Sequence, residues 1–543
     1  MDQVPYKYSI HFKELIKDML SQEIKVKVQS LWDRLWAGGL SNPIEAIEQI
    51  SYLLFMKRLE IFQPDIPSQY KWSMYTKYNN SELVNHVKNV VFQFIKKELC
   101  KDGDPFAVAM DDAVFKFNNP DLLKDAITYI DAIYIEIEKE ITGKKNYFQD
   151  IQGDVYEHLL QQTSEAGKNG QFRTPRHIIS MMAEILDPDI DGKICDVTSG
   201  SGGFLVGAFQ YIISKYSQQL EPNDDGLMRG VDGGNLDSPK RKILEENTFY
   251  GFDIDHTMVR IGVMNLMMHG ISKPNIINVD SLSEGYEKLE MGHLNSKKKI
   301  EIDDKRIQGV YKYILANPPF TGKVDSQRIS ENLNRIYQLK RNQQGERQNI
   351  TVQSELLFLE RIIYMLQENG RACVIVPEGV LFNSGKAHQA ARKLLITDCR
   401  LQGVISLPSG VFLPYTGVKT SILIFSKLKR NQAAVQSADI WFYGMDSDGY
   451  SLDNSRRRKL DNPLPETIQQ WENRSSIDQT NRRLQHFNIP ISEIIVNDYE
   501  LNFNLYKEFV YEPQEFESSQ SLLEKLNVLE TQIQEGLSSL SNL

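Results

Sequence analysis

The sequence predicts an α/β protein with a parallel sheet wound on both faces, preceded by an all-helical N-terminal region and followed by a helical tail. From about residue 170, short β-rich runs alternate with amphipathic helical runs, the pattern of strand–helix–strand units. Before that point, apolar residues recur every three or four positions, which is the period of helices. At 543 residues the chain exceeds the usual content of one compact core, and this indicates several domains.

The composition excludes several classes of protein. Hydrophobic residues make up 41% and charged residues 25%, which excludes a disordered or collagen-like chain. No apolar run approaches the roughly 18 residues that span a bilayer, so no membrane partner is expected. The N-terminus lacks the layout of a secretory signal, and the cysteines are far apart: Cys100, Cys195, Cys373 and Cys399. We therefore expect a cytoplasmic protein with no disulfide scaffold and no metal site.

The first 165 residues are expected to form a helical domain. Ser41-Asn42-Pro43 supplies a helix cap and a first-turn proline, and apolar residues follow at helical spacing: Ile44, Ile47, Ile50 and Leu54. A second long helix is expected from about Leu122 to Ile141, where apolar residues repeat in the same way.

Residues 166–430 are expected to form the catalytic domain. Its strands are predicted at Lys193–Asp196, Thr248–Asp253, Asn275–Asp280, Tyr311–Ala316, Arg371–Val376, Leu401–Ser406 and Ser421–Phe425. Helices are predicted between them at Phe204–Tyr216, Thr257–His269, Glu355–Gln367 and Lys386–Thr397. Ligands of such sheets bind at the carboxyl ends of the strands, so the candidate residues are those that follow each strand.

The residues after the catalytic domain are predicted to form a connecting region and a docking helix. Residues 431–515 are expected to be an irregular, basic connecting region, and 516–543 an amphipathic helix that needs a partner surface. The net charge of −10 means that a nucleic-acid role needs a local basic face or a partner. The arginines at 456–458, in a basic run that ends at Lys459, and the loop at 321–351 are candidates for phosphate contacts, and solvated surface loops are the alternative.

The first candidate site is a turn rich in glycine. Asp196 ends a strand, Val197-Thr198-Ser199-Gly200-Ser201-Gly202-Gly203 follows, and a helix begins. Glycines let the backbone approach a ligand closely, and a helix N-terminus offers unpaired N–H groups. A phosphate-binding P-loop needs a lysine that is absent, and a dinucleotide fingerprint needs glycine in place of Leu205. An ordinary turn before a helix is the remaining alternative.

Acidic residues also end the next two strands. Asp253 follows Tyr250-Gly251-Phe252, and its carboxylate suits two ribose hydroxyls, as in dinucleotide-binding folds. Asp255 is expected to cap the helix that follows. Asp280 ends the third strand and is a candidate for the amino group of an adenine ring. A purely structural role is the alternative for a strand-end aspartate.

The most specific motif is Asn317-Pro318-Pro319-Phe320, after the fourth strand. Two prolines impose a stiff, extended turn and remove two N–H donors, so the carbonyls remain available as acceptors. Asn317 adds a side-chain carbonyl, and Phe320 adds a flat ring. This combination suits a planar group that carries an NH₂, because two acceptors bind its two N–H bonds while the ring stacks on its face. Holding both hydrogens localises the nitrogen lone pair, so no strong base is needed.

Together these motifs resemble those of amino-group DNA methyltransferases, and the whole chain is similar to the modification (M) subunit of type I restriction–modification systems. The segment from Gln171 to Arg176 is similar to the family's signature ahead of the glycine turn, although Thr174 and Pro175 also predict a helix cap and a first-turn proline. Later blocks follow in the family's order: Pro377–Phe382, Ile405–Pro408, Val411-Phe412 and Thr416–Thr420. The chain departs from the family where Val197-Thr198-Ser199 replaces Pro-Ala-Cys, and where Asp253 replaces the commoner Glu.

The resemblance implies a Rossmann-like class I methyltransferase core that uses S-adenosyl-L-methionine and methylates N6 of an adenine flipped out of DNA, site-specifically. It implies cofactor binding by Gln171, Phe172, Arg173, Thr174, Pro175, Arg176, Asp196, Thr198, Gly200, Ser201, Gly202, Gly203, Asp253 and Asp280. Catalysis is implied for Asn317, Pro318, Pro319 and Phe320. The implied partners are DNA, a specificity subunit that recognises the target, a restriction subunit and a second copy of this chain.

Three other functions share part of this pattern. N4-cytosine methyltransferases more often carry Ser in place of Asn317. Glutamine methyltransferases that act on proteins lack the long helical flanks. A scaffold that binds S-adenosylmethionine without catalysis would not need an intact Asn317–Phe320 motif.

Overall fold

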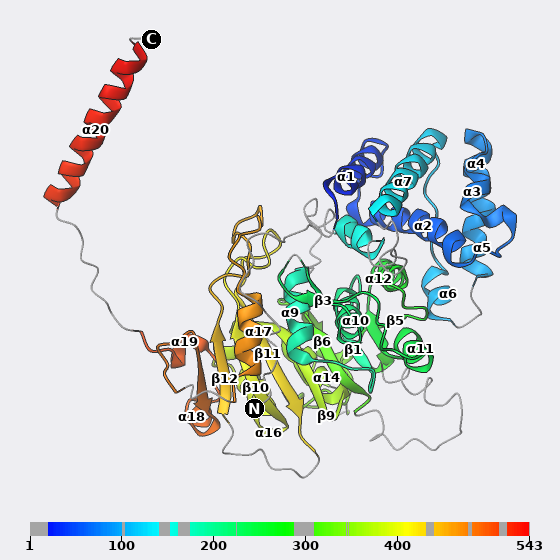
Figure 1. Ribbon diagram of the computed structural model, residues 1–543. Coiled ribbons are helices and arrows are strands. Elements are labelled where there is room, and N and C mark those ends of the chain that lie inside the picture. Colours follow the sequence, from blue (N-terminus) through cyan, green and yellow to red (C-terminus); the bar gives the residue numbers. More distant parts are fainter. Residues whose placement is uncertain are drawn as a thin grey trace. The chain divides into compact units, whose positions relative to one another are not determined.

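A nine-stranded sheet with helices on both faces organises the chain (Figure 1). The computed structural model describes residues 20–99, 104–140, 152–160, 174–223, 225–286, 309–343, 345, 347–429, 439–475, 480–509 and 519–541. The strand order is β13-β12-β10-β11-β9-β6-β1-β4-β5. These strands are β1 Ile194–Asp196, β4 Phe249–Asp253, β5 Asn275–Asn278, β6 Tyr311–Ala316, β9 Leu366–Pro377, β10 Cys399–Ser406, β11 Thr420–Lys427, β12 Asp439–Gly444 and β13 His486–Pro490.

The sheet is mostly parallel, which confirms the predicted α/β fold class, and two strands, β11 and β13, depart from the parallel order. Parallel pairing joins β1 to β4 and β6, β4 to β5, β6 to β9, and β10 to β12. β11 runs antiparallel to β9 and β10, and β13 runs antiparallel to β12. Residues 407–419, between β10 and β11, contain no helix, so the chain returns directly beside the strand it has just left. Such a direct return gives an antiparallel pair, whereas a parallel pair needs a crossover.

Part of the region expected to be irregular belongs to the sheet. Residues 439–506 contribute β12, β13 and the helices α17 Leu464–Glu472, α18 Ile491–Val496 and α19 Phe503–Tyr506. Trp441, Phe442 and Phe487 are at most 1% exposed, so these strands complete the hydrophobic core. Burial of aromatic side chains on a pleated surface outweighs the polar composition of the flanking segments.

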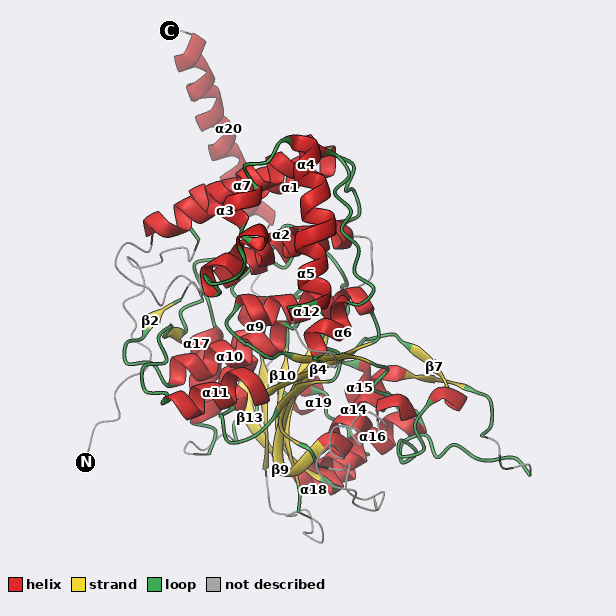
Figure 2. Ribbon diagram, turned by 90° about the vertical axis from the view of Figure 1, so that its right-hand side faces the viewer, coloured by secondary structure: helices red, strands yellow, loops and turns green. Residues whose placement is uncertain are grey.

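Helices cover the two faces of the sheet separately (Figure 2). One face carries α9 Arg176–Leu186, α10 Gly203–Lys215, α11 Ser238–Asn247, α12 His256–Met268 and α17. The other carries α14 Ser354–Met365, α15 Gly379–Phe382, α16 Lys386–Thr397 and α18. Each face has its own hydrophobic cluster; Leu205 belongs to the first and Leu357 to the second. The sheet therefore separates two cores.

The N-terminal helices share the first of these cores. They are α1 Gln22–Ala37, α2 Pro43–Phe62, α3 Trp72–Tyr75, α4 Asn80–His86, α5 Phe92–Lys97, α6 Pro105–Met110 and α7 Pro120–Glu140, followed by helical residues 152–160. Both long helices predicted in this region are confirmed, as α2 and α7. Asn42 caps α2 by accepting from the backbone N–H of Ile44 at 3.1 Å, with Pro43 in the first turn. One hydrophobic cluster runs without a break from α1 to α12.

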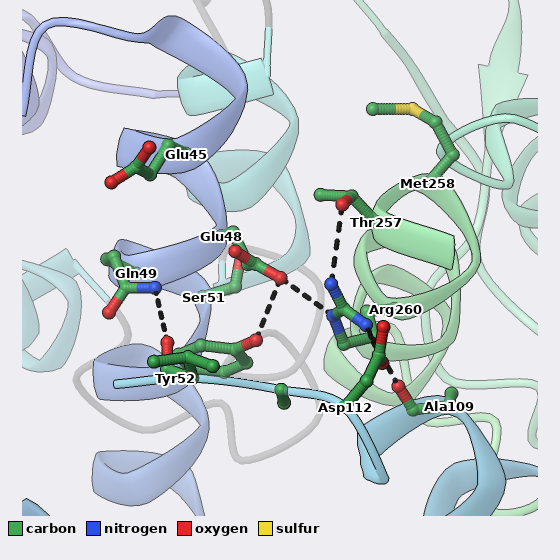
Figure 3. A network of polar contacts seen from close by, with 12 residues as sticks. Glu45, Glu48, Gln49, Ser51, Tyr52, Ala109, Asp112, Thr257, Met258 and Arg260 are labelled. Carbon is green, nitrogen blue, oxygen red and sulfur yellow. Dashed lines mark hydrogen bonds and ion pairs between the residues drawn. The ribbon is translucent and has the colours of Figure 1, made fainter. Parts of the chain in front are cut away.

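A buried ion-pair network joins α2 to α12 (Figure 3). The Arg260 side chain is 7% exposed, and its Nε lies 2.7 Å from Glu48 Oε1. Its Nη1 pairs with Asp112, and Tyr52 donates its hydroxyl to the same Glu48 oxygen at 2.9 Å. A buried charge needs this degree of pairing, because desolvation of an unpaired ion costs several kcal/mol.

A second buried arginine holds the other end of the same two helices. Arg58, on α2, donates to the backbone carbonyl of Met268 at the end of α12, at 3.0 Å, and to Gln152 at 2.7 Å. Burial lowers the pKa of Arg58 to about 10. Arg260 and Arg58 therefore fix α2 to α12 at two separate points.

The tail forms a separate unit, residues 507–543. Its helix, α20 Ser519–Ser541, confirms the helix predicted there. Apolar side chains on it are more than half exposed: Leu522, Leu523, Leu526, Val528, Leu529, Ile533 and Leu537. None of the helices described in the structure has both the length and the apolar character that would cross a bilayer.

We expect Arg260→Met to lower the free energy of unfolding by about 3–5 kcal/mol, because it leaves the Glu48 carboxylate buried without its cation. Urea unfolding measures this change, and Arg457→Met, at an exposed arginine, is the control. The double variant Glu48→Gln/Arg260→Met should recover part of the loss. An Arg260→Met chain as stable as the control would contradict this account of the network.

Candidate active site

Four of the polar residues selected from the sequence stand at neighbouring strand ends. Asp196 ends β1, Asp253 ends β4, Asp280 follows β5 and Asn317 follows β6. These four strands are adjacent in the sheet and parallel to one another. Their carboxyl ends therefore meet at one edge, where ligands of such sheets bind.

A cavity of about 570 Å³ opens at this edge. Its volume lies in the range of small-molecule sites, and most of its lining is apolar. The predicted residues that line it are Thr174, Asp196, Thr198, Gly200, Ser201, Gly203, Asp253, Asp280, Asn317 and Pro319. Pro175, Arg176, Gly202, Pro318 and Phe320 are not among the lining residues. Gln171, Phe172 and Arg173 lie outside the described residues.

The glycine turn is held by backbone hydrogen bonds to the next strand. Ser199 donates its N–H to the carbonyl of Phe252 at 2.9 Å, and Gly202 donates to the carbonyl of Ser199 at 2.7 Å. Gly200 and Gly202 have φ angles of 49° and 78°, a left-handed conformation that favours glycine. A Cβ on Gly202 would lie 2.5 Å from the Leu266 side chain, so α12 also approaches this turn closely.

Asp253 links the glycine turn to the end of β4. Its Oδ2 accepts from the N–H of Gly200 and its Oδ1 from that of Asp255, each at 2.9 Å. Burial raises its pKa. A carboxylate has about four acceptor positions, so Asp253 keeps acceptor capacity for a ligand besides these backbone contacts. Asp255 caps α12 by accepting from Thr257 N and Met258 N, as predicted.

Asp196 is the most deeply buried acid of the cavity, at 1% exposure. Burial, reinforced by the negative charge of Asp253 and opposed by hydrogen bonds from Thr198, raises its pKa to about 7. The bond from Thr198 N to Oδ1 measures 3.0 Å. Asp196 therefore holds the first residues of the turn in place.

Asp280 shapes the turn that follows β5. Its Oδ1 accepts from the N–H of Leu282 at 2.9 Å, and its backbone carbonyl accepts from Ser283. Ser281 donates its hydroxyl to the carbonyl of Val197 at 2.9 Å, which ties this turn to the residues after β1. The turn is thus held by contacts within itself and by one contact to the segment that follows β1.

Asn317 is oriented by a residue far away in the sequence. Its Nδ2 donates to Thr174 Oγ1 at 3.0 Å, across 143 positions of the chain. Its Oδ1 is buried and has no hydrogen-bond partner among the described residues. A buried acceptor without a donor is costly, and here it belongs to a residue that lines the cavity. The side chain therefore offers an acceptor to a ligand that brings an N–H.

The prediction that Thr174 caps a helix with Pro175 in its first turn is wrong. Pro175 is itself the cap residue of α9, which begins at Arg176, and no side chain caps this helix. The Thr174 hydroxyl binds Asn317 instead. Arg176 turns toward the N-terminal helical region, where its Nη2 pairs at 2.5 Å with Asp154, a side chain that is 2% exposed.

The two prolines and Phe320 differ in whether they face the cavity or the core. Pro319 is exposed and lines the cavity, whereas Pro318 is buried. Phe320 is 4% exposed and packs edge-to-face on Phe412, with ring centroids 5.6 Å apart at 86°. The structure thus places this ring in the core and not on the cavity wall, because apolar contact with Phe412 stabilises the buried position.

Residues of the cavity that the sequence analysis missed come from remote elements. Pro43, Ile44 and Ile47 of α2 line it, and so do Leu160 and Tyr415. The three α2 residues were selected only as helix-forming positions. Their place in the cavity depends on the packing of α2 against α12, for which the sequence contains no local signal.

The fold and this edge define a class of protein. A Rossmann-like sheet with a glycine turn, acidic strand ends and an Asn-Pro-Pro-Phe turn is that of a methyltransferase acting on an amino group. Residues 148–515 match the family described as N-6 DNA Methylase, so the chain belongs to that family. The predicted N6-adenine DNA methyltransferase is thereby confirmed.

Similar proteins agree with this assignment. The type I restriction enzyme EcoEI methylase subunit of Escherichia coli is 28% identical over 429 residues, 75% of this chain and 74% of its own length. The EcoKI methylase subunit of Escherichia coli strain K12 is 25% identical over 440 residues, 79% and 72% respectively. The similarity to modification subunits of type I systems is therefore confirmed.

Two solved structures share the fold. A chain from work on complex assembly and conformational transition of the type I R-M system has a TM-score of 0.62 at 20% identity, covering 96% of this chain and 98% of its own. The type I restriction-modification methyltransferase subunit from Streptococcus thermophilus has a TM-score of 0.57 at 17% identity, covering 90% and 100%. At these identities the comparisons establish the fold.

The raised pKa of Asp196 gives a pH-dependent prediction. Between its ordinary value of 3.8 and about 7, the folded chain keeps a proton that the unfolded chain releases. The contribution of this residue to stability is therefore complete at acidic pH and is lost as the pH rises toward 7. Asp196→Asn cannot ionise, so it should stabilise the chain more at about pH 7.5 than at about pH 5. Urea unfolding of both chains at the two pH values measures the difference.

The matched control is Asp237→Asn, the same change at the exposed cap of α11. An effect of Asp196→Asn that is equal at both pH values would show that Asp196 ionises in the folded chain as it does in the unfolded one.

Proposed function

We propose that the chain transfers a methyl group from S-adenosyl-L-methionine to N6 of an adenine flipped out of DNA, as the modification subunit of a type I restriction–modification complex. The observation that carries this proposal is the buried, unpartnered Oδ1 of Asn317 at the cavity edge. An exocyclic NH₂ supplies the donor that this oxygen lacks.

The cavity fits the proposed cofactor. The Asp253 carboxylate suits the ribose hydroxyls, and Asp280 suits the amino group of the adenine ring. The glycine turn allows close approach of the methionine portion, since a side chain at Gly200 or Gly202 would be strained. When bound, S-adenosylmethionine supplies an electrophilic methyl group on a sulfonium.

The Asn-Pro-Pro turn prepares the amine for this transfer. Asn317 Oδ1 accepts one N–H of the target, and a carbonyl of the turn, freed of local donors by the prolines, accepts the other. This arrangement localises the nitrogen lone pair and so makes the amine a better nucleophile. The hydrogen bond from Asn317 Nδ2 to Thr174 Oγ1 engages the amide nitrogen, and Oδ1 is then available to the substrate.

The target amine of a duplex is hidden in the base stack, so the adenine must be flipped out at a cost of a few kcal/mol. Stacking on an aromatic ring can return about 1–3 kcal/mol. Phe320 can serve only after its side chain leaves Phe412, whereas Pro319 and Tyr415 line the cavity directly. Arg457 and Lys459 are exposed in the basic run and are candidates for phosphate contacts.

Target recognition is assigned to a partner. With a net charge of −10, the chain alone is expected to bind DNA weakly and without sequence preference. The exposed leucine stripe of α20 supports docking of a specificity subunit, since exposed apolar stripes mark contact surfaces. A restriction subunit and a second copy of this chain complete the proposed complex.

Asn317→Ala should abolish methyl transfer and leave S-adenosylmethionine binding nearly intact, because it removes an acceptor that acts on the amine in the transition state. Transfer of labelled methyl groups to DNA by the full complex, with calorimetry for the cofactor, measures both. Asn383→Ala removes the same amide from an exposed residue outside the cavity and is the control. Substantial methyl transfer by Asn317→Ala would contradict the catalytic role of Asn317.

Asp253→Ala should weaken S-adenosylmethionine binding by about 1–3 kcal/mol, the scale of lost hydrogen bonds to a charged group. Asp237→Ala, which also removes a carboxylate that accepts a backbone N–H, is the control outside the cavity. If calorimetry finds the affinity unchanged, the ribose contact lies elsewhere, with Asp255 the next candidate.

A chain ending before Ser519 should keep its fold and its cofactor binding, because residues 507–543 form a unit of their own. It should lose co-purification with the specificity subunit, and site-specific methylation with it. Leu529→Glu/Ile533→Glu charges the apolar stripe and should act like the truncation. Asn527→Glu/Thr531→Glu, at the same i, i+4 spacing but outside the stripe, should not. Assembly and methylation by the truncated chain would leave the N-terminal helices as the docking surface.

A further inference from the structure

The N-terminal helical region supplies part of the cavity wall. Pro43, Ile44 and Ile47, in the first turns of α2, line the cavity with Leu160. Ile44 is only partly buried, so part of its side chain faces open space. On the other side of the cavity stand the glycine turn and the acidic strand ends. The wall from α2 is apolar, whereas the opposite wall contains most of the polar groups.

Helix α12 lies between this wall and the glycine turn and contacts both. Asn265, fully buried on α12, donates from Nδ2 to the carbonyl of Ser201 and to Glu157 of the helical segment 152–160, each at 2.8 Å. A Cβ on Gly262 would lie 2.9 Å from the carbonyl oxygen of Gly200, so the turn rests directly on α12. Met258 and Ile261 of α12 line the cavity beside α2.

The Arg260 network fixes the position of the first turns of α2 relative to α12. Glu48, its buried partner, directly follows Ile47 in the sequence, so the ion pair acts on the turn of α2 that lines the cavity. In Figure 3, Arg260 extends from α12 toward Glu48 of α2, and Met258 lies two residues earlier on the same helix. Movement of α2 away from α12 would break this pair and expose both charges to an apolar interface.

We propose that the first turns of α2 form part of the S-adenosylmethionine site, and that Arg260 is a positioning residue that holds them there through Glu48. The N-terminal helices are thus a component of cofactor binding and not only a flank of the catalytic core. This inference rests on the proposed cofactor. A packing role alone would leave cofactor affinity insensitive to the partly buried Ile44.

The first test fills the cavity from the α2 side. Ile44→Trp should weaken S-adenosylmethionine binding by about tenfold or more, because the larger ring occupies ligand space. Ile61→Trp makes the same exchange on the same helix, at a side chain that is 39% exposed and not a lining residue. Calorimetry with S-adenosylmethionine alone measures both affinities, and thermal unfolding shows that both variants fold.

The results of this test separate two claims. If the unaltered chain binds no S-adenosylmethionine, the proposed cofactor is wrong. If the unaltered chain binds S-adenosylmethionine and a folded Ile44→Trp chain binds it equally well, the proposed cofactor is supported. The proposed contribution of α2 to its site is then wrong. Loss of affinity in Ile44→Trp but not in Ile61→Trp supports the wall.

The second test separates positioning from stability. Glu48→Gln weakens the pair with Arg260, and Asp131→Asn makes the same carboxylate-to-amide change at the Lys57–Asp131 pair, which holds α2 to α7 at 2.8 Å. Glu48→Gln should raise KM for S-adenosylmethionine about fivefold and leave kcat within about twofold, the pattern of lost ground-state binding. Asp131→Asn should lower the melting temperature without moving KM.

Equal KM values for the two variants, or a fall in kcat with unchanged KM, would overturn the positioning role of Arg260. Arg260→Lys keeps the positive charge near Glu48 but loses the forked donors to Asp112 and Thr257, so its affinity should lie between that of Arg260→Met and that of the unaltered chain. If Arg260→Lys binds S-adenosylmethionine no better than Arg260→Met does, the positive charge at position 260 does not hold α2 in place.

Discussion

The buried charge of Arg260 is the constraint on which the catalytic edge depends. A guanidinium that is 7% exposed is stable only with its partners in place, so Glu48, Asp112 and Thr257 have little freedom. Arg260 lies on α12, the helix that begins at His256, shortly after Asp253, and supports the glycine turn through Asn265. A single helix thereby relates the N-terminal region, the acidic strand end and the turn. The cavity has its shape because these three parts cannot shift independently.

The sequence predicts well whatever a short segment determines by itself. The strand–turn–helix units, the cap of α2 by Asn42 and the cap of α12 by Asp255 all depend on neighbours within a few residues. It predicts poorly what depends on partners far along the chain. β11 is antiparallel because its connection lacks a helix, and β12 is a buried strand because Trp441 and Phe442 find a place beside β10. The contribution of α2 to the cavity has the same origin, since only folding brings Ile44 near Asp253.

Some properties of Asn317 follow from its own motif, and others depend on residues far away in the sequence. The motif Asn317–Phe320 indicates which atoms are acceptors, because the prolines remove the competing donors. It does not indicate that Thr174, 143 positions earlier, binds the amide nitrogen, a contact that leaves Oδ1 without a partner among the described residues. Phe320 illustrates the opposite case, in which a residue assigned to stacking contributes its ring to the core beside Phe412. The chemistry of a motif is therefore local, but its orientation belongs to the whole fold.

The acidic residues at the strand ends have a consequence for the binding of cations. Asp196 and Asp253 face one largely apolar cavity, where charges interact more strongly than in water. Burial raises the pKa of Asp253, and it raises that of Asp196 to about 7, so neither carboxyl group ionises as readily as it does in water. A positively charged ligand favours the ionised carboxylates and therefore lowers both pKa values when it binds. Binding of a cation at this edge is thus coupled to the release of protons and strengthens as the pH rises.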